Sequence, residues 1–281
     1  MSGARHHFIQ AALLGAFGDV QLGKPLREAP IEIRRRGNSA TETTTPDEVG
    51  WVHELYRRTS VPAGVDPDLV DNVWSPIENA YRDRVTKLEN RSTDAADLSW
   101  LISYVCAAGV RHPDFGDAVN RWRAEVGQAP IAGDAVQVAR LVFSNNGLVP
   151  LGEFRWRIGH SRQEAPRFIV NDLGWMYVSD PGMRGRGLIV PLNSRVAALA
   201  WIDPANRGAV DHQDMRPGTI RWLNAATWEQ APEFVVGHPD DKNYLKELRD
   251  AAYVGNRVTT QLGAYYGFET RNPRTGLFAD L

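Results

Sequence analysis

The chain has 281 residues, of which 43% are hydrophobic and 23% are charged, and its formal net charge is −2. This composition is that of an ordinary folded protein, and the near-neutral balance excludes a global field that would draw the chain to nucleic acid or to a membrane. The single cysteine, Cys106, excludes an intramolecular disulfide and a cysteine-rich metal site, and it is expected to be a buried apolar side chain. No apolar run approaches the ~18 residues that span a bilayer, and the N-terminus lacks a secretory pattern. We therefore expect a cytoplasmic protein that does not enter the membrane.

Short elements are expected in the first 68 residues. The pattern predicts a weakly helical apolar segment over 6–17, strands within 22–36, and Ser/Thr-rich and proline-containing loops over 38–46 and 60–68. Between the loops, Thr45-Pro46-Asp47-Glu48 has an N-cap residue, a first-turn proline and first-turn acids, so a short helix ending near Tyr56 is predicted.

Helices dominate the next stretch. One amphipathic helix is predicted from apolar residues at spacings of three and four: Leu69, Val73, Trp74, Ile77, Tyr81, Val85 and Leu88. A second helix should begin at Thr93–Ala96 and stop near Gly109 and His112, because a residue before proline avoids the helical region. Two further helices are expected over about 115–126 and 133–143, which completes a helical half over about 46–145.

The remainder is richer in strands. Alternation of apolar and charged residues over 154–158 predicts a half-buried strand. Residues 167–203 read as short strands in succession, with Pro and Gly at their ends, and the turn Ser179–Gly182 can present the carboxylate of Asp180 to a cleft. Helices are expected from Pro217 and from Asp240. The strand-rich half covers about 150–237, and a C-terminal helix and tail cover 238–281.

These elements predict an α+β fold in which a helical N-terminal half packs on a mostly antiparallel sheet. We expect a single domain over 1–281, because the early strand around Ile31 should join the later sheet. No internal repeat is visible in the sequence.

Common catalytic motifs are absent from the sequence: there is no P-loop, GxGxxG, HExxH, GxSxG or CxxC. Residues 182–187 are glycine-rich but lie between two strands, so a hairpin loop is expected rather than a phosphate site at a helix N-terminus. Its side chains Arg184 and Arg186 could still contact phosphates.

Several polar residues have both a structural and a functional interpretation. His6 and His7 are adjacent, so their rings point in different directions, and either could be a general acid or base. Glu78 either pairs with Arg82 one turn later or points into a pocket.

Three more residues are open in the same way. Arg111 either complements the dipole of its helix or joins a site. Asp180 either forms an Asx-turn or acts chemically. Asn224 either caps a backbone group or lines a site.

Phrases in a fixed order along residues 5–237 carry a family resemblance. They are Arg5-His6-His7-Phe8-Ile9, then Pro46, Val49, Glu54, Leu55 and Tyr56, then Glu78, Arg111-His112-Pro113, Tyr177–Pro181 with Pro191–Ser194, and Leu223-Asn224 with Ala231. In this order they resemble a bacterial family catalogued as domain of unknown function 4238. The chain departs from the family pattern where Gln10-Ala11 replaces the proline of the opening phrase, where Ser-Asp-Pro-Gly lacks the asparagine, and where Arg-His-Pro replaces Arg-Thr-Pro. Members are encountered among bacterial anti-phage genes, so the resemblance implies a toxic or nucleic-acid-directed effector.

The leading hypothesis is a hydrolase of the nuclease type, with RNA or a nucleotide as substrate. Catalytic roles are predicted for His7, Glu78, Arg111, Asp180 and Asn224, and substrate contacts for His6, Ser179, Arg184 and Arg186. The sequence requires no cofactor, although two carboxylates could hold Mg²⁺. The oligomeric state is left open.

Two alternatives stay open. The nine tryptophans and eight tyrosines could form a recognition surface without turnover, although a core role is favoured for most of them. A small-molecule enzyme on the same scaffold is the other alternative. A closed polar pocket containing Glu78 and Asp180 would favour catalysis, and a flat aromatic patch would favour partner binding.

Overall fold

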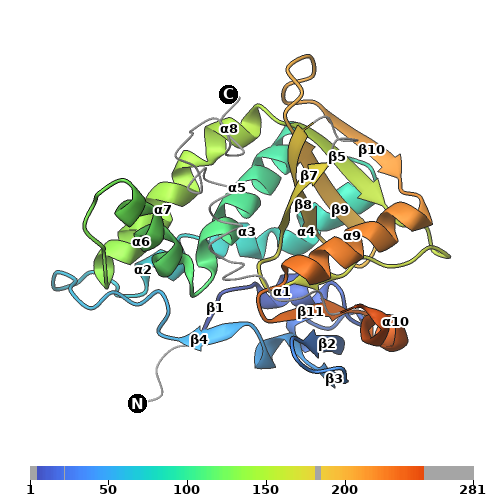
Figure 1. Cartoon of the computed structure of the whole chain (residues 1–281), viewed down its shortest axis with the longest axis horizontal. Helices are drawn as coiled ribbons and strands as arrows, with labels where there is room; N and C mark the ends of the chain where they lie inside the picture. Colours follow the sequence, from blue (N-terminus) through green and yellow to red (C-terminus); the bar gives the residue numbers. More distant parts are fainter. Residues whose placement is uncertain (1–4, 22, 181–184, 250–281) are drawn as a thin grey trace.

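The computed structural model describes residues 5–21, 23–180 and 185–249, and within them it shows an α+β fold (Figure 1). A helical layer lies beside a five-stranded sheet, and a smaller four-stranded sheet lies below them in the view of Figure 1. The fold class predicted from the sequence is confirmed.

The five-stranded sheet has the order β10-β5-β9-β8-β7. Its strands are β5 (Arg155–His160), β7 (Met176–Asp180), β8 (Gly185–Pro191), β9 (Val196–Trp201) and β10 (Val210–Asp214). All neighbours pair antiparallel except β10 and β5, which run parallel. Residues Trp156 and Ile158 of β5 are fully buried between half-buried arginines, as the alternation predicts.

The four-stranded sheet joins the two ends of the described chain, in the order β3-β2-β11-β6. Its members are β2 (Ile31–Arg35), β3 (Thr41–Thr44), β6 (Val170–Asn171) and β11 (Phe234–Gly237). Strand β2 pairs antiparallel with β11, so the prediction that the early strand joins a later sheet is confirmed. A separate two-stranded pair joins β1 (Arg5–His7) to β4 (Trp51–His53).

The helical layer is centred on α5 (Ala95–Arg111). Asp94 caps it in a capping box: the Asp94 carboxylate accepts a hydrogen bond from the Asp97 backbone N–H, and the Asp97 carboxylate accepts one from the Asp94 backbone N–H. The neighbouring helices are α2 (Leu69–Asn72), α3 (Ser75–Asn79), α4 (Tyr81–Glu89), α6 (Phe115–Glu125), α7 (Asp134–Asn146) and α8 (Leu148–Gly152).

Three more helices accompany the sheets: α1 (Ala11–Gly15), α9 (Pro217–Gln230) and α10 (Lys242–Glu247). Helix α9 packs against β6, β7 and β11, so it bridges the two larger sheets. One buried hydrophobic cluster contains side chains of both halves, including Leu13, Trp74, Trp156 and Leu223. Cys106 is buried, as predicted. No helix of the described residues is long and apolar enough to cross a membrane.

Several predicted elements differ in the structure. The predicted single helix over residues 69–88 is three helices. Pro76 stands in the first turn of α3, where its missing N–H separates α3 from α2, and a second break at Ala80 separates α3 from α4. The predicted helix over 45–56 is wrong: only Pro46–Glu48 forms one 3-10 turn, and β4 follows it.

Two further predictions placed strands incorrectly. The predicted loop over 38–46 contains β3, whose threonines form the exposed edge of the smaller sheet. The strand predicted at Phe168–Val170 is not part of the meander, because β6 belongs to the smaller sheet and only β7, β8 and β9 pair in succession.

Candidate functional site

His6 is a structural residue of the β1–β4 pair. Its Nδ1 accepts a hydrogen bond from the backbone N–H of Tyr56 at 2.9 Å, and its ring stacks on the Tyr56 ring with centroids 5.4 Å apart. Its Nε2 lies 3.6 Å from Oδ1 of Asp68. The ring is buried, so these contacts fasten β1 to the segment after β4 and leave no face for a substrate.

His7 is half-buried, and its Nε2 has no hydrogen-bond partner among the described residues. Burial lowers the pKa of His7 below its usual value, and the positive charge of Arg111 lowers it further, against the opposing effect of Asp47, Glu78 and Asp71. The ring is therefore neutral at pH 7, with a nitrogen that can accept or donate a proton.

Arg111, the last residue of α5, is almost fully buried beside His7. It forms an ion pair with Glu78 and donates from Nη2 to the His7 carbonyl at 2.6 Å. Asp71 lies 3.7 Å away, and the guanidinium also lies over the ring of Trp74 with 5.0 Å to the centroid. Burial opposes the charge, but Tyr56 and Glu78 outweigh it and raise the pKa of Arg111 above its usual value. Arg111 thus holds the β1 backbone and two acids together.

The structure therefore brings His7, Glu78 and Arg111 into one cluster, which we call the His7 cluster together with Asp47 and Asp71. The ion pair predicted between Glu78 and Arg82 is wrong, because α3 ends at Asn79 and Glu78 turns to Arg111 on α5. Sequence reasoning missed Asp71 and Asp47. The only signal for them in the sequence was the high density of acidic residues nearby. Such a density usually indicates a solvent-exposed surface and not a site.

The β7–β8 hairpin carries the other predicted acid. Ser179 and Asp180 end β7, opposite Arg186 and Gly185 of β8, and the pairing confirms that two strands flank this turn. The structure gives only the backbone of these residues, and Arg184 lies outside the described residues. The convergence of Asp180 with Glu78 stays a prediction.

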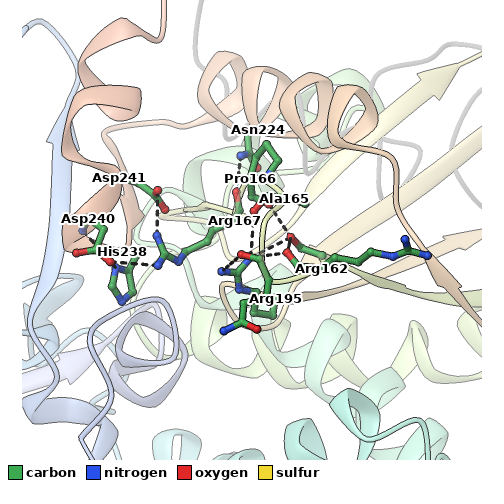
Figure 2. Close-up of polar contacts among 11 residues, drawn as sticks. Arg162, Ala165, Pro166, Arg167, Arg195, Asn224, His238, Asp240 and Asp241 are labelled. Atoms are coloured by element: carbon green, nitrogen blue, oxygen red, sulfur yellow. Dashed lines mark hydrogen bonds and ion pairs between the residues drawn. The ribbon is translucent and has the colours of Figure 1, made fainter.

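Asn224 does not belong to the His7 cluster. It is buried on α9, donates from Nδ2 to the Arg167 carbonyl at 2.7 Å and accepts from the Ile169 N–H at 3.2 Å (Figure 2). It thus satisfies two backbone groups at the entry to β6. Of the two interpretations of Asn224 given above, these contacts correspond to the structural one, in which its side chain caps backbone groups.

A polar pocket lies next to this segment. Its volume is about 410 Å³, and its lining includes Arg82, Arg167, Arg195, Ser194 and His238. Two other pockets, whose linings are more apolar, have volumes of about 660 and 600 Å³. They lie where β10 meets the start of α9, and both are lined by Met215 and Arg216.

A histidine pair between β5 and β10 was also missed. His160 Nε2 lies 2.9 Å from His212 Nδ1, and His212 Nε2 lies 2.8 Å from the Thr93 hydroxyl. Burial, with help from Arg91 and His212, lowers the pKa of His160 to about 4. The two histidines lie on the neighbouring strands β5 and β10, where His212 is opposite Ile158 and His160 is opposite Asp214. They are 52 residues apart in the sequence, so no local pattern indicates their contact.

No group of three or more His, Cys, Asp or Glu side chains within 5–21, 23–180 and 185–249 could hold a metal ion. A magnesium site therefore stays a prediction of the sequence. Comparison of the chain with protein-family models, curated proteins and solved structures gives no match. The resemblance to domain of unknown function 4238 stays a prediction as well.

Proposed function

We propose that the protein is a nucleic-acid-directed hydrolase, with RNA as the favoured substrate and His7 as the catalytic acid–base residue. The observation that carries the proposal is the Nε2 of a neutral His7, a buried atom that has no hydrogen-bond partner among the described residues and lies beside the fixed guanidinium of Arg111. Substrate binding must therefore expose this nitrogen. The role in bacterial defence rests on the family resemblance alone.

RNA suits this arrangement because its 2′-hydroxyl is a built-in nucleophile. A neutral imidazole at His7 can take the 2′-hydroxyl proton while the oxygen attacks the adjacent phosphorus and the 5′-oxygen leaves. The imidazolium then returns its proton to the leaving oxygen. The proton and the electron pairs balance in this route.

The cluster also sets a requirement on substrate binding. Asp47, Asp71 and Glu78 outnumber Arg111, so the rim around His7 does not attract a phosphate by itself. Cationic contacts must come from other residues, and under the proposal these are Arg184 and Arg186, the arginines for which the sequence predicts substrate contacts. Under the proposal, Arg111 and Glu78 position the β1 backbone and thereby His7.

The experiment compares RNA cleavage by His7→Ala with that by His53→Ala. His53 is an exposed imidazole on β4, in register with Arg5 of the same strand pair, so it is a matched control. We expect the cleavage rate to fall by roughly 10²–10⁴-fold in His7→Ala, to stay unchanged in His53→Ala, and melting temperatures to stay close to the parent value. Asp180→Ala should behave like His7→Ala. Wild-type cleavage in both active-site variants would refute the assignment.

The alternative of a recognition module is less well supported. Trp74, Trp100, Trp156, Trp175 and Trp228 are buried, and Trp222 is the one strongly exposed tryptophan of the described residues. The aromatic side chains thus serve mainly as core. Among the tryptophans of the described residues, burial of most of them leaves no flat aromatic patch of the kind that the binding alternative expects.

A further inference from the structure

The polar pocket defined above has two chemically different walls. Ala16, Val20, Leu26 and Val85 provide an apolar wall from α1, the segment after it and α4. The other part of the lining is polar and includes the guanidinium groups of Arg167 and Arg195 and the imidazole of His238. A pocket of about 410 Å³ lies in the size range of small-molecule sites.

Arg195 is held without a carboxylate. Its Nη1 donates to the carbonyls of Arg162 at 2.8 Å and Ala165 at 3.0 Å, and its Nη2 donates to the Gln163 carbonyl at 3.1 Å. No ion pair joins it to an acid among the described residues. Carbonyl groups orient a guanidinium but do not neutralise it, so Arg195 is a fixed positive charge with its Nε–H still available.

Arg167 is the neighbouring cation. Figure 2 shows it between Asp240 and Asp241 on one side and Arg195 on the other. Asn224 holds its carbonyl, so the segment that carries it is fixed. Burial, followed by the charge of Arg167, lowers the pKa of Arg195, against the opposing effect of Asp241 and Glu89. Asp240 and Asp241 already neutralise Arg167, so the positive charge in the pocket that has no acid partner is that of Arg195, and an anion beside it would stabilise it.

The remaining polar groups are hydrogen-bond donors. Burial and the charge of Arg167 lower the pKa of His238, and its Nδ1 accepts from the Asp240 N–H, so the neutral ring carries its proton on Nε2. The hydroxyl of Ser194 has no partner among the described side chains, and Arg82 stands exposed at the rim. Glu89, the one acid of the lining, accepts from Asn193 at 3.2 Å.

We propose that this pocket binds a small phosphate monoester whose organic part rests on the apolar wall, as in a nucleoside monophosphate. The phosphate would lie against Arg195 and Arg167, with Ser194 and Arg82 as further donors. Arginine is suited to this role because its planar donors match phosphate oxygens in pairs. The proposal does not rest on RNA hydrolysis, because it uses none of the residues of the His7 cluster.

The test is calorimetric titration of the full chain with AMP, adenosine and inorganic phosphate. We expect saturable binding of AMP and much weaker binding of both adenosine and inorganic phosphate. Adenosine can contact only the apolar part of the pocket, and inorganic phosphate can contact only the arginines. Arg195→Gln should weaken AMP binding roughly 10- to 100-fold, the range for charged hydrogen bonds. Arg207→Gln, which removes an exposed arginine paired with Glu153, is the matched control and should bind as the parent does.

Arg195 also ties the 161–166 segment, so each variant is checked for native circular dichroism. If Arg195→Gln does not fold, the Arg82→Gln, Ser194→Ala double variant replaces it, because both residues line the pocket and the one backbone contact of their side chains is the long, exposed bond from Arg82 to the Lys24 carbonyl at 3.5 Å. The proposal is overturned if AMP does not bind at millimolar concentration, or if adenosine binds as tightly. It is equally overturned if the folded pocket variant keeps the parent affinity. RNA cleavage is not a readout here, so neither proposal decides the other.

Discussion

Asn224 offers the sharpest test of whether a predicted site residue is catalytic or structural. Its amide donates to the carbonyl of Arg167 and accepts from the N–H of Ile169, and α9 holds it fully buried. In Asn224→Ala both backbone groups lose their partner at once. The bond from the Ile169 N–H is buried, so this group then has no access to water, whereas the bond to the Arg167 carbonyl is only partly buried and this carbonyl can be partly rehydrated.

The expected loss follows from these two groups. A buried polar group left without a partner costs about 1–3 kcal/mol, so we expect Asn224→Ala to lower the free energy of unfolding by about 2–4 kcal/mol. For a chain of this size, that is a fall of roughly 5–15 °C in melting temperature. Urea unfolding followed by circular dichroism measures the free energy, and calorimetry measures the melting temperature.

Two further variants separate the explanations. Asn224→Asp keeps the acceptor for Ile169 but loses the donor to Arg167 and buries a charge, so it should be destabilised at least as much. Asn243→Ala, at an exposed asparagine on α10, should change stability by less than about 0.5 kcal/mol. An Asn224→Ala protein that keeps its melting temperature but loses RNA cleavage would refute the structural role.

Three other outcomes are expected. His160 has a folded-state pKa of about 4, below the unfolded value of 6.5, so its contribution to stability is complete above about pH 6.5 and is lost as pH falls towards 4. Urea unfolding across this range should show a free energy of unfolding that falls with pH, and His160→Gln should reduce this dependence. Arg140→Met should cost about 2–4 kcal/mol, because the buried guanidinium donates to the carbonyls of Val110 and His112 at the end of α5; a loss below about 1 kcal/mol in urea unfolding would contradict this. Asp97→Ala should cost about 1–3 kcal/mol, since the capping box and the ion pair with Arg84 go together; an unchanged denaturation midpoint would show that neither matters.

Local patterns predicted the elements whose residues act on near neighbours. The helix ending at Arg111 was predicted because its apolar spacing and the following His112-Pro113 are properties of a few adjacent residues. The same reasoning failed after Pro46, because the residues that start a helix do not determine how far the helix continues. Trp51–His53 form a strand because they pair with β1, and this pairing is not a local property.

The candidate site shows the same limit. His7, Glu78 and Arg111 were each recognised as polar residues at element ends, but Glu78 was assigned to the wrong arginine. The correct partner is 33 residues away on another helix, and only the packing of α3 on α5 makes the contact. Arg167 and Arg195 were not singled out at all. Arg195 is held by the carbonyls of residues 162–165, and backbone groups leave no trace in a sequence pattern. Arg167 pairs with Asp240 and Asp241, 73 and 74 residues away in the sequence.

The pairing of β2 with β11 has a consequence for how the protein is made. Ile33 of β2 pairs with Val236 of β11. A ribosome that adds roughly 5–20 residues per second reaches Val236 about 10–40 s after Ile33. Throughout that interval β2 has only β3 beside it, so one edge of β2 lacks its partner in the smaller sheet. The nascent chain therefore carries an unpaired strand edge until β11 has been made, and such an edge is a template for pairing with another chain.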